Sequence, residues 1–168
     1  RGPDRAWHGD MLDGVGFVRA MRQAGGEPAG ERALLIGAGG AGSAIGLQLL
    51  DAGVSELAIH DMDAGRRDAL ISRLSAAYPR RVRAGSTDPD GFGIIANATP
   101  LGMRAGDPLP VAVEKLAPGM FIGDVITAPE VSPLLEAGRS LGCKTQTGLN
   151  MFLAQRELIV DFLEGKPV

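Results

Sequence analysis

Three glycines with the spacing Gly37-x-Gly39-x-x-Gly42 form the most recognisable chemical pattern in this chain of 168 residues. They follow an apolar run and precede a helical pattern, which is the context that a phosphate-binding loop needs. We expect Gly37 to permit a tight turn, Gly39 to let the backbone approach a pyrophosphate, and Gly42 to let the helix pack on the strand. Amides at the start of that helix would then face the anion. A simple strand-to-helix turn is the alternative. The predicted contacts are Gly37, Ala38, Gly39, Gly40, Ala41 and Gly42.

A carboxylate stands where the ribose of a bound dinucleotide would lie. Asp61 ends a predicted strand, 19 residues after Gly42. A carboxylate at that position can accept hydrogen bonds from both hydroxyls of an adenosine ribose, and its charge repels a 2′-phosphate. Asp61 therefore favours NAD over NADP, although Arg66 and Arg67 follow within a helical turn. The competing interpretation is a helix N-cap, a role that Asp63 could also fill.

A second polar cluster ends the apolar run before residue 97. In an open α/β sheet, ligands bind outside the carboxyl ends of the strands, at the point where the strand order reverses. We expect Asn97, Thr99 and the backbone amides around them to face this crevice and to hold the nicotinamide-side ribose and phosphate. A turn cap is the alternative, because Asn and Pro are common turn residues. The predicted contacts are Asn97, Ala98, Thr99 and Pro100.

The elements that position these groups alternate between strand and helix. Short runs with apolar residues predict strands at 33–36, 55–61, 82–84, 92–98 and 119–126, and the polar segment 144–148 is a candidate sixth strand. Helical spacing and capping residues predict helices at 11–24, 41–52, 64–78, 132–143 and 149–165. Most of the predicted strands are apolar on both faces. The sequence therefore predicts an α/β fold of the Rossmann type, in which helices cover both faces of a doubly wound parallel sheet.

The composition narrows the classes of partner. A net charge of −3 without a basic cluster argues against nucleic acid, and no apolar run reaches the length of a membrane span. The single cysteine, Cys143, excludes an internal disulfide and suits a reducing compartment. His8 and His60 fit no metal motif, and His60 reads as a partly buried strand residue. We expect a cytoplasmic, metal-free monomer or homodimer that binds a small-molecule substrate.

Five motifs carry a family resemblance. In order and spacing, GDMLDGVGF, GAGGAGSAI, NATPLGM, GDVITAPEVSPLL and GLNMFLAQ resemble the shikimate/quinate dehydrogenase family. The resemblance implies an NAD(P)-dependent oxidoreductase that interconverts 3-dehydroshikimate and shikimate in aromatic amino-acid biosynthesis. It also implies an N-terminal lobe for the substrate and a C-terminal lobe for the cofactor. Two alternatives stay open: an NAD-dependent dehydrogenase of quinate or another cyclitol acid, and a non-catalytic dinucleotide-binding module.

The resemblance assigns substrate-side roles to three residues. Asp13 matches an aspartate that pairs with a catalytic lysine, and Gln155 matches a glutamine that contacts a ring hydroxyl. Thr127 stands where a substrate-contacting tyrosine is usual. Without the resemblance, Asp13 and Gln155 would both read as solvated helix residues.

On the cofactor side, the resemblance places Val125 and Gly148 against the nicotinamide. Independently of the resemblance, Met151 is expected to flank the predicted crevice and to contact the cofactor. The family's usual Asn-Arg-Thr after the second strand is replaced by Asp61-Met62-Asp63, whereas Arg66 matches a later arginine of that pattern. This departure puts a preference for NADP in doubt and indicates a divergent branch.

One family residue has no counterpart. The catalytic lysine precedes the aspartate in the family, but the twelve residues before Asp13 contain no lysine, and Lys115, Lys144 and Lys166 come too late. We therefore expect the sequence to be the C-terminal part of a longer enzyme. Residues 1–10 would be a linker, and 11–168 an NAD(P)-binding domain with inter-lobe helices at both ends.

Overall fold

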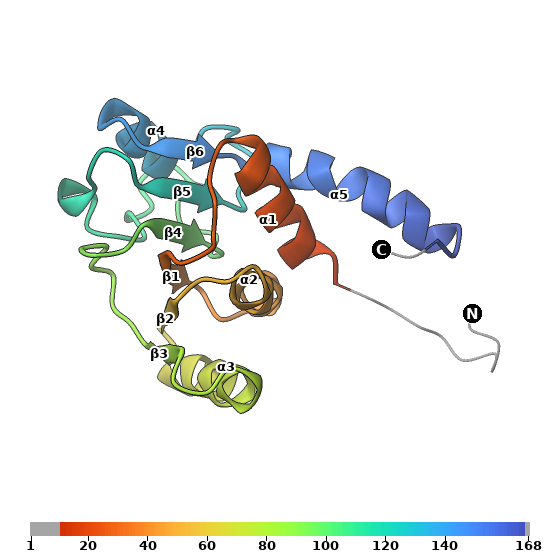
Figure 1. Ribbon diagram of the computed structural model, residues 1–168. Coiled ribbons are helices and arrows are strands. Elements are labelled where there is room, and N and C mark those ends of the chain that lie inside the picture. The colour runs from red at the N-terminus through yellow and green to blue at the C-terminus, as the bar shows by residue number, and fades with distance from the viewer. Residues whose placement is uncertain (1–10, 167–168) are drawn as a thin grey trace.

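Strands and helices alternate along most of the chain in the computed structural model, which describes residues 11–166 (Figure 1). The strands are β1 (Arg32–Ile36), β2 (Glu56–His60), β3 (Val82–Ala84), β4 (Ile94–Asn97), β5 (Phe121–Asp124) and β6 (Lys144–Gln146). The helices are α1 (Asp13–Gln23), α2 (Gly40–Asp51), α3 (Ala64–Ala77), the 3-10 helix η1 (Val113–Lys115), α4 (Pro133–Ser140) and α5 (Gly148–Leu163). The predicted linker at 1–10, with His8, lies outside the described residues.

The six strands form one parallel sheet in the order β3-β2-β1-β4-β5-β6. The chain winds outward from β1 to β3, returns to the centre, and winds outward again from β4 to β6, so the strand order reverses between β1 and β4. Ile36 at the end of β1 pairs with His60 of β2 on one side and with Asn97 of β4 on the other. The predicted doubly wound parallel sheet is confirmed, and its switch point lies beside the glycine loop.

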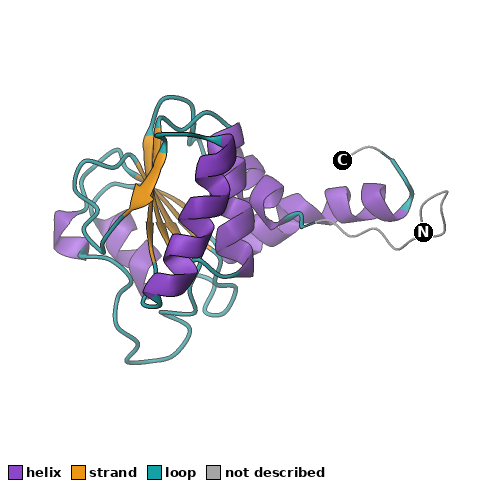
Figure 2. Ribbon diagram, turned by 90° about the horizontal axis from the view of Figure 1, so that it is seen from below, coloured by secondary structure: helices purple, strands orange, loops and turns teal. Residues whose placement is uncertain are grey.

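Successive side chains along each strand point to opposite faces of the sheet, so the core consists of two layers. Leu35 of β1 faces a cluster that includes Phe17 of α1 and Ile45 of α2, whereas Leu34 faces a second cluster with Leu134 of α4 and Val111. Both faces of the central strands are therefore buried, as is typical of parallel sheets. Figure 2 shows the strands between helices on both sides.

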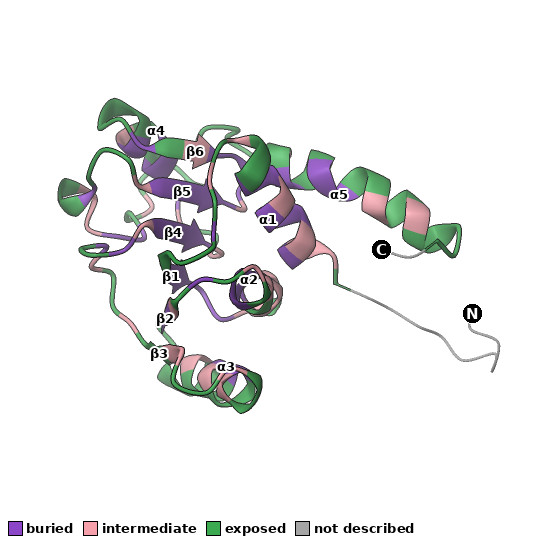
Figure 3. Ribbon diagram, viewed as in Figure 1, coloured by how far each residue is buried: buried purple, intermediate pink, exposed green. Residues whose placement is uncertain are grey.

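The ends of the chain carry helices that pack on each other. α1 contacts both α2 and α5. The first half of α5 is buried at Met151 and Ala154, whereas its second half extends from the body of the domain and is largely exposed (Figures 1 and 3). Cys143 is buried, and its thiol lies 3.3 Å from the Ala117 carbonyl oxygen, to which it donates. Among the described helices, none combines the length and apolar character that crossing a membrane requires.

β4 and β5 are shorter than predicted. The apolar runs at 92–98 and 119–126 suggested longer strands, but pairing between β4 and β5 ends at Asn97 and Asp124. Beyond these residues, the backbone leaves the sheet to form the loops of the site described below, and an apolar pattern cannot show where a ladder ends.

Candidate functional site

The loop between β1 and α2 needs glycine at two positions. Gly37 has a φ of +101°, and a Cβ atom there would lie 2.8 Å from the Ala98 carbonyl oxygen. At Gly42, a Cβ atom would lie 2.0 Å from the Gly37 carbonyl oxygen. Gly37 thus allows the turn and the approach of β4, and Gly42 allows helix α2 to start close against the strand.

Gly39 differs from these two glycines because it faces open space. A Cβ atom there would have no described protein atom within 4 Å, and the residue is the N-cap of α2 without a capping side chain. The amides of Gly40, Ala41 and Gly42 have no acceptor among residues 11–166. A helix start with free N–H groups and room beside it suits an anion such as a phosphate.

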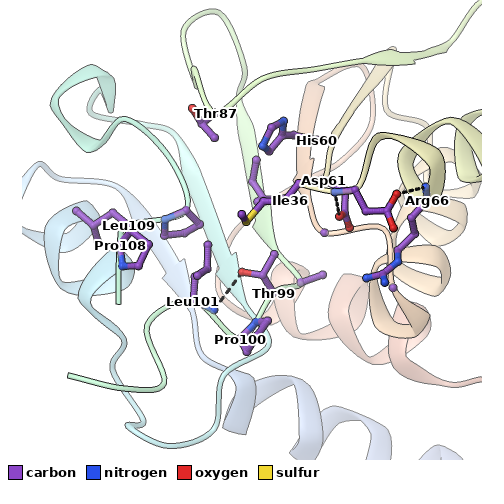
Figure 4. Close-up of a pocket in the computed structure, with 16 residues that line it drawn as sticks. Ile36, His60, Asp61, Arg66, Thr87, Thr99, Pro100, Leu101, Pro108 and Leu109 are labelled. Atoms are coloured by element: carbon purple, nitrogen blue, oxygen red, sulfur yellow. Dashed lines mark hydrogen bonds between the residues drawn. The ribbon is translucent and has the colours of Figure 1, made fainter. Parts of the chain in front are cut away.

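A cavity of about 630 Å³ opens beside this loop (Figure 4). Its size is within the range of small-molecule sites. It lies at the carboxyl ends of β1, β2 and β4, where ligands bind in sheets of this type. Its walls are Ile36, Gly37 and Gly39, His60 to Asp63 with Arg66, Thr87, Ala98 to Leu101, and Pro108 to Pro110.

Asp61 and Asp63 have separate roles in the structure. The Asp61 carboxylate accepts from the Ala38 amide at 2.7 Å through Oδ2 and from the Asp63 amide at 2.8 Å through Oδ1. The Asp63 carboxylate caps α3 by accepting from the Arg66 amide at 3.0 Å. Asp63, and not Asp61, is therefore the N-cap of α3. The Asp61 carboxylate lines the cavity and binds the glycine loop through the Ala38 amide.

The Asp61 carboxylate is held in its ionised form. Partial burial by itself raises its pKa, but the hydrogen bonds from the Ala38 and Asp63 amides and the charge of Arg66 outweigh burial, so the pKa is lower than the ordinary aspartate value. Arg66 lines the same cavity. Met62, whose side chain is exposed, also lines it. The cavity is therefore lined by two aspartates, Asp61 and Asp63, and one arginine, Arg66, after β2.

The segment after β4 differs from the prediction in one respect. Ala98, Thr99 and Pro100 line the cavity, but Asn97 does not, because its side chain is completely buried. The expectation that the Asn97 side chain faces the crevice is wrong. Its Oδ1 accepts from the Thr99 amide at 3.1 Å and from the Thr99 hydroxyl at 2.6 Å. Asn97 thus shapes the loop from within and leaves the contact surface to its neighbours.

Asp124 at the end of β5 was missed in the sequence. It is completely buried, and its carboxylate accepts from Asn97 Nδ2 at 3.1 Å, from the Ile126 amide at 3.0 Å and from the Ser132 hydroxyl at 2.6 Å. Burial raises the pKa of Asp124 above the ordinary value, although these hydrogen bonds oppose the shift. An acidic residue inside the apolar run FIGDVI was the signal that could have revealed it.

Two residues to which the resemblance assigns substrate-side roles meet at a second, smaller cavity. Gln155 Nε2 donates to Asp13 Oδ1 at 3.0 Å, and both residues line a cavity of about 280 Å³ together with Ile159 and Phe162. Thr127 lies in the turn after β5, is exposed, and does not line this cavity. The structure therefore brings Asp13 and Gln155 together but leaves Thr127 apart from them.

The predicted nicotinamide-side residues lie around the start of α5. The Gly148 amide donates to the Ile126 carbonyl at 3.1 Å, and a Cβ atom on Gly148 would lie 2.3 Å from the Val125 carbonyl oxygen. Met151 is 7% exposed and belongs to the main core cluster. The side chain of Met151 is thus a core residue and lines none of the cavities described here.

Several walls of the large cavity carried no sequence signal. His60, expected to be partly buried, is half-buried and lines the cavity, as do Thr87 and the Pro108-Leu109-Pro110 segment. The last two come from loops without a motif. Within the described part of the chain, no cluster of three or more His, Cys, Asp or Glu residues could hold a metal ion.

Taken together, the fold and the site define a dinucleotide-binding domain of the Rossmann type. A glycine loop at the switch point of a parallel sheet opens into a helix with free amides, and an ionised carboxylate stands at the end of the second strand. No family model matches the chain.

The curated proteins that this chain resembles include shikimate and quinate/shikimate dehydrogenases. The chain is 43% identical to a shikimate dehydrogenase (NADP(+)) of Rubrobacter xylanophilus over 88% of its own length and 54% of the relative. It is 31% identical to a quinate/shikimate dehydrogenase (NAD(+)) of Corynebacterium efficiens over 92% of its length and 56% of the relative. The chain spans about half the length of the curated relatives it matches.

Solved structures agree with the sequence comparison. A quinate dehydrogenase of Corynebacterium glutamicum in complex with NAD superposes with a TM-score of 0.78 at 31% identity, over 88% of this chain and 54% of the other. A shikimate 5-dehydrogenase of Listeria monocytogenes in complex with shikimate and NAD gives 0.84 at 27% identity, over 95% and 60%. The resemblance to the shikimate/quinate dehydrogenase family is confirmed over this part of its members' length.

Proposed function

We propose that this chain is the cofactor-binding part of an NAD(P)-dependent oxidoreductase that interconverts shikimate and 3-dehydroshikimate. The observation that carries the proposal is the large cavity, which is lined by Gly37, by Gly39 at the start of helix α2, and by Asp61. The relatives named above supply the expected substrate class. The nicotinamide would take up or release the hydride, and the protein would bind, orient and exclude water.

The cofactor that this cavity suits best is NAD. Each oxygen of the Asp61 carboxylate accepts a hydrogen bond from one backbone amide of the protein. Because each oxygen can accept a second hydrogen bond, the two hydroxyls of a ribose can bind there. A 2′-phosphate would meet the Asp61 charge at close range, which opposes NADP. Arg66 in the same wall is the one group that favours NADP. The pyrophosphate would lie on the amides beside Gly39, where a side chain is absent and space is open.

On the substrate side, we propose that Asp13 orients a catalytic lysine supplied by another part of the enzyme. Gln155 would fix the Asp13 carboxylate through one N–H and offer its remaining N–H and its oxygen to a ring hydroxyl of the substrate. Thr127, Val125 and Gly148 would complete the junction between substrate and nicotinamide. The substrate is thus a small hydroxylated ring acid. We further propose a cytoplasmic monomer or homodimer without a nucleic-acid or membrane partner.

A calorimetric titration of this chain with NAD and then NADP tests the cofactor proposal. We expect NAD to bind at least tenfold more tightly. Tighter binding of NADP would mean that Arg66 outweighs Asp61, and no binding of either would contradict the proposal.

Two alternatives need an assay of the two-lobed enzyme on shikimate and quinate. The ionised Asp61 favours NAD, the cofactor named for the quinate/shikimate relative, so quinate dehydrogenase is the second candidate. Preferential turnover of quinate would support it. Tight cofactor binding without turnover of either acid would instead indicate a non-catalytic dinucleotide-binding module.

A further inference from the structure

The side chains of Asn97 and Asp124 join the two loops that leave the sheet at the centre of the site. We infer that Asp124 is a positioning residue, which acts through Asn97 to hold these loops where the nicotinamide half of the cofactor would lie. The inference rests on the proposed function, because it concerns the geometry of the same cofactor site.

The hydrogen bond between the Asn97 and Asp124 side chains lies where the backbone pairing of β4 and β5 ends. Asn97 and Asp124 are the last register pair between these strands, and Asn97 Nδ2 donates to Asp124 Oδ1 at 3.1 Å. The strands themselves are held by their ladder and do not need this bond to stay adjacent. Its position indicates that the pair governs the loops that follow.

From Asn97, the hydrogen bonds run outward to the large cavity. Asn97 Oδ1 accepts from the amide and the hydroxyl of Thr99, and the Thr99 hydroxyl oxygen in turn accepts from the Leu101 amide at 3.2 Å. Thr99 and Leu101 both line the cavity. The orientation of the Asn97 amide therefore determines the shape of this wall.

From Asp124, the hydrogen bonds run to the other side of the site. Its carboxylate accepts from the Ile126 amide, and the Ile126 carbonyl accepts from the amide of Gly148, the first residue of α5. Gly148 packs directly against the Val125 backbone. One buried carboxylate thus connects the cavity wall after β4 with the turn after β5 and the start of α5.

The chemistry of the partners requires a hydrogen-bond acceptor at position 124. The three groups from Asn97, Ile126 and Ser132 that contact it are all donors. Oδ1 accepts from Asn97 and Ile126, whereas Oδ2 contacts only the Ser132 hydroxyl, which can also accept. An asparagine that keeps its oxygen at the place of Oδ1 would therefore preserve the bond to Asn97, whereas a leucine offers no acceptor at all. A completely buried carboxyl group is costly to keep unless such donors surround it. Replacing Asp124 by Leu should therefore release the loops while nearly keeping the side-chain volume.

The test separates the two halves of the cofactor. Asp124→Leu and Asn97→Ala each cut the bond between the loops, and each variant is titrated with NAD and with ADP, which lacks the nicotinamide half. We expect the affinity for NAD to fall at least tenfold while the affinity for ADP changes less than twofold. Ser132→Ala is the matched control, because it removes a buried hydrogen bond to the same carboxylate but leaves Asn97 in place. Its ratio of NAD to ADP affinity should match that of the unmodified chain.

Equal losses for NAD and ADP, or no loss for either, would assign the pair a purely structural role and overturn the inference. Failure of both variants to fold would do the same. If the unmodified chain binds NAD but the variants behave in one of these ways, only the inference fails. If the unmodified chain binds neither NAD nor ADP, the proposed function fails and the inference fails with it.

Discussion

Asp13 at the start of α1 and Gln155 in α5 form a 3.0 Å hydrogen bond across a separation of 142 residues. The contact exists because α1 and α5 pack against each other and because Gly16 has no side chain. A Cβ atom on Gly16 would lie 2.2 Å from Gln155 Cγ. Helices α1 and α5 thus meet at Asp13 and Gln155, the two residues to which the resemblance assigns substrate-side roles.

The first prediction concerns this packing. Gly16→Ala should destabilise the domain by about 1–3 kcal/mol, because it overpacks the α1–α5 contact. Urea unfolding measures the effect. In a Gln155→Ala background the obstructing atoms are gone, so the same substitution should cost much less. Equal costs in both backgrounds would show that Gln155 does not limit the space at Gly16.

The second prediction separates binding from chemistry at Asp13. In the proposed two-lobed enzyme, Asp13→Ala should lower kcat at least 100-fold, because the aspartate would no longer orient the proposed catalytic lysine. The affinity for the cofactor should change less than twofold, since Asp13 does not line the large cavity. Steady-state kinetics and calorimetry provide the two readouts. Turnover that stays unchanged would rule out the proposed role.

The third prediction compares two glycines of the same loop. Gly42→Ala should destabilise the domain strongly, because the new Cβ atom would lie 2.0 Å from a backbone oxygen. Gly39→Ala should cost only about 1 kcal/mol, the usual penalty for alanine at an N-cap, yet weaken NAD binding at least tenfold by filling the open space. Thermal unfolding and calorimetry on both variants check this. Normal NAD binding by Gly39→Ala would place the pyrophosphate elsewhere.

The fourth prediction concerns the choice between NAD and NADP. Asp61→Asn retains an oxygen that can accept from the Ala38 amide but removes the charge, so the ratio of NADP to NAD affinity should rise about tenfold. Asp61→Ala also removes the acceptor for the loop and should weaken both cofactors. Titrations of the two variants distinguish charge from loop anchoring. If Asp61→Asn leaves the ratio unchanged, Asp61 does not select the cofactor.

The fifth prediction follows from the lowered pKa of Asp61. A carboxyl group whose pKa is lower in the folded state binds fewer protons there than in the unfolded chain. Its stabilisation is therefore present above the ordinary aspartate pKa of about 3.9 and is lost as the pH falls through the lower, folded value. The difference in free energy of unfolding between the unmodified chain and Asp61→Asn should be larger at pH 6 than at pH 2. A difference independent of pH would contradict the shift.

Local patterns in the sequence determined the order of elements and the type of site. Apolar runs and helical spacing are properties of neighbouring residues, so the alternation of strands and helices could be predicted without knowledge of the packing. The glycine spacing could also be interpreted locally, because a φ of +101° at Gly37 is a backbone requirement that glycine meets. The Ser132 N-cap of α4 was also predictable locally, because a capping serine accepts from an amide in the first turn of its own helix.

Only the tertiary structure decided which polar residues reach the cavity. Asn97 and Thr99 stand two positions apart in one motif, yet one is completely buried and the other lines the cavity. The buried Asn97 side chain donates to Asp124, which β5 brings to it from 27 residues away. The contact between Asp13 and Gln155 likewise depends on how α1 packs on α5. Strand register and helix packing join residues that are distant along the chain, and no local pattern specifies such contacts.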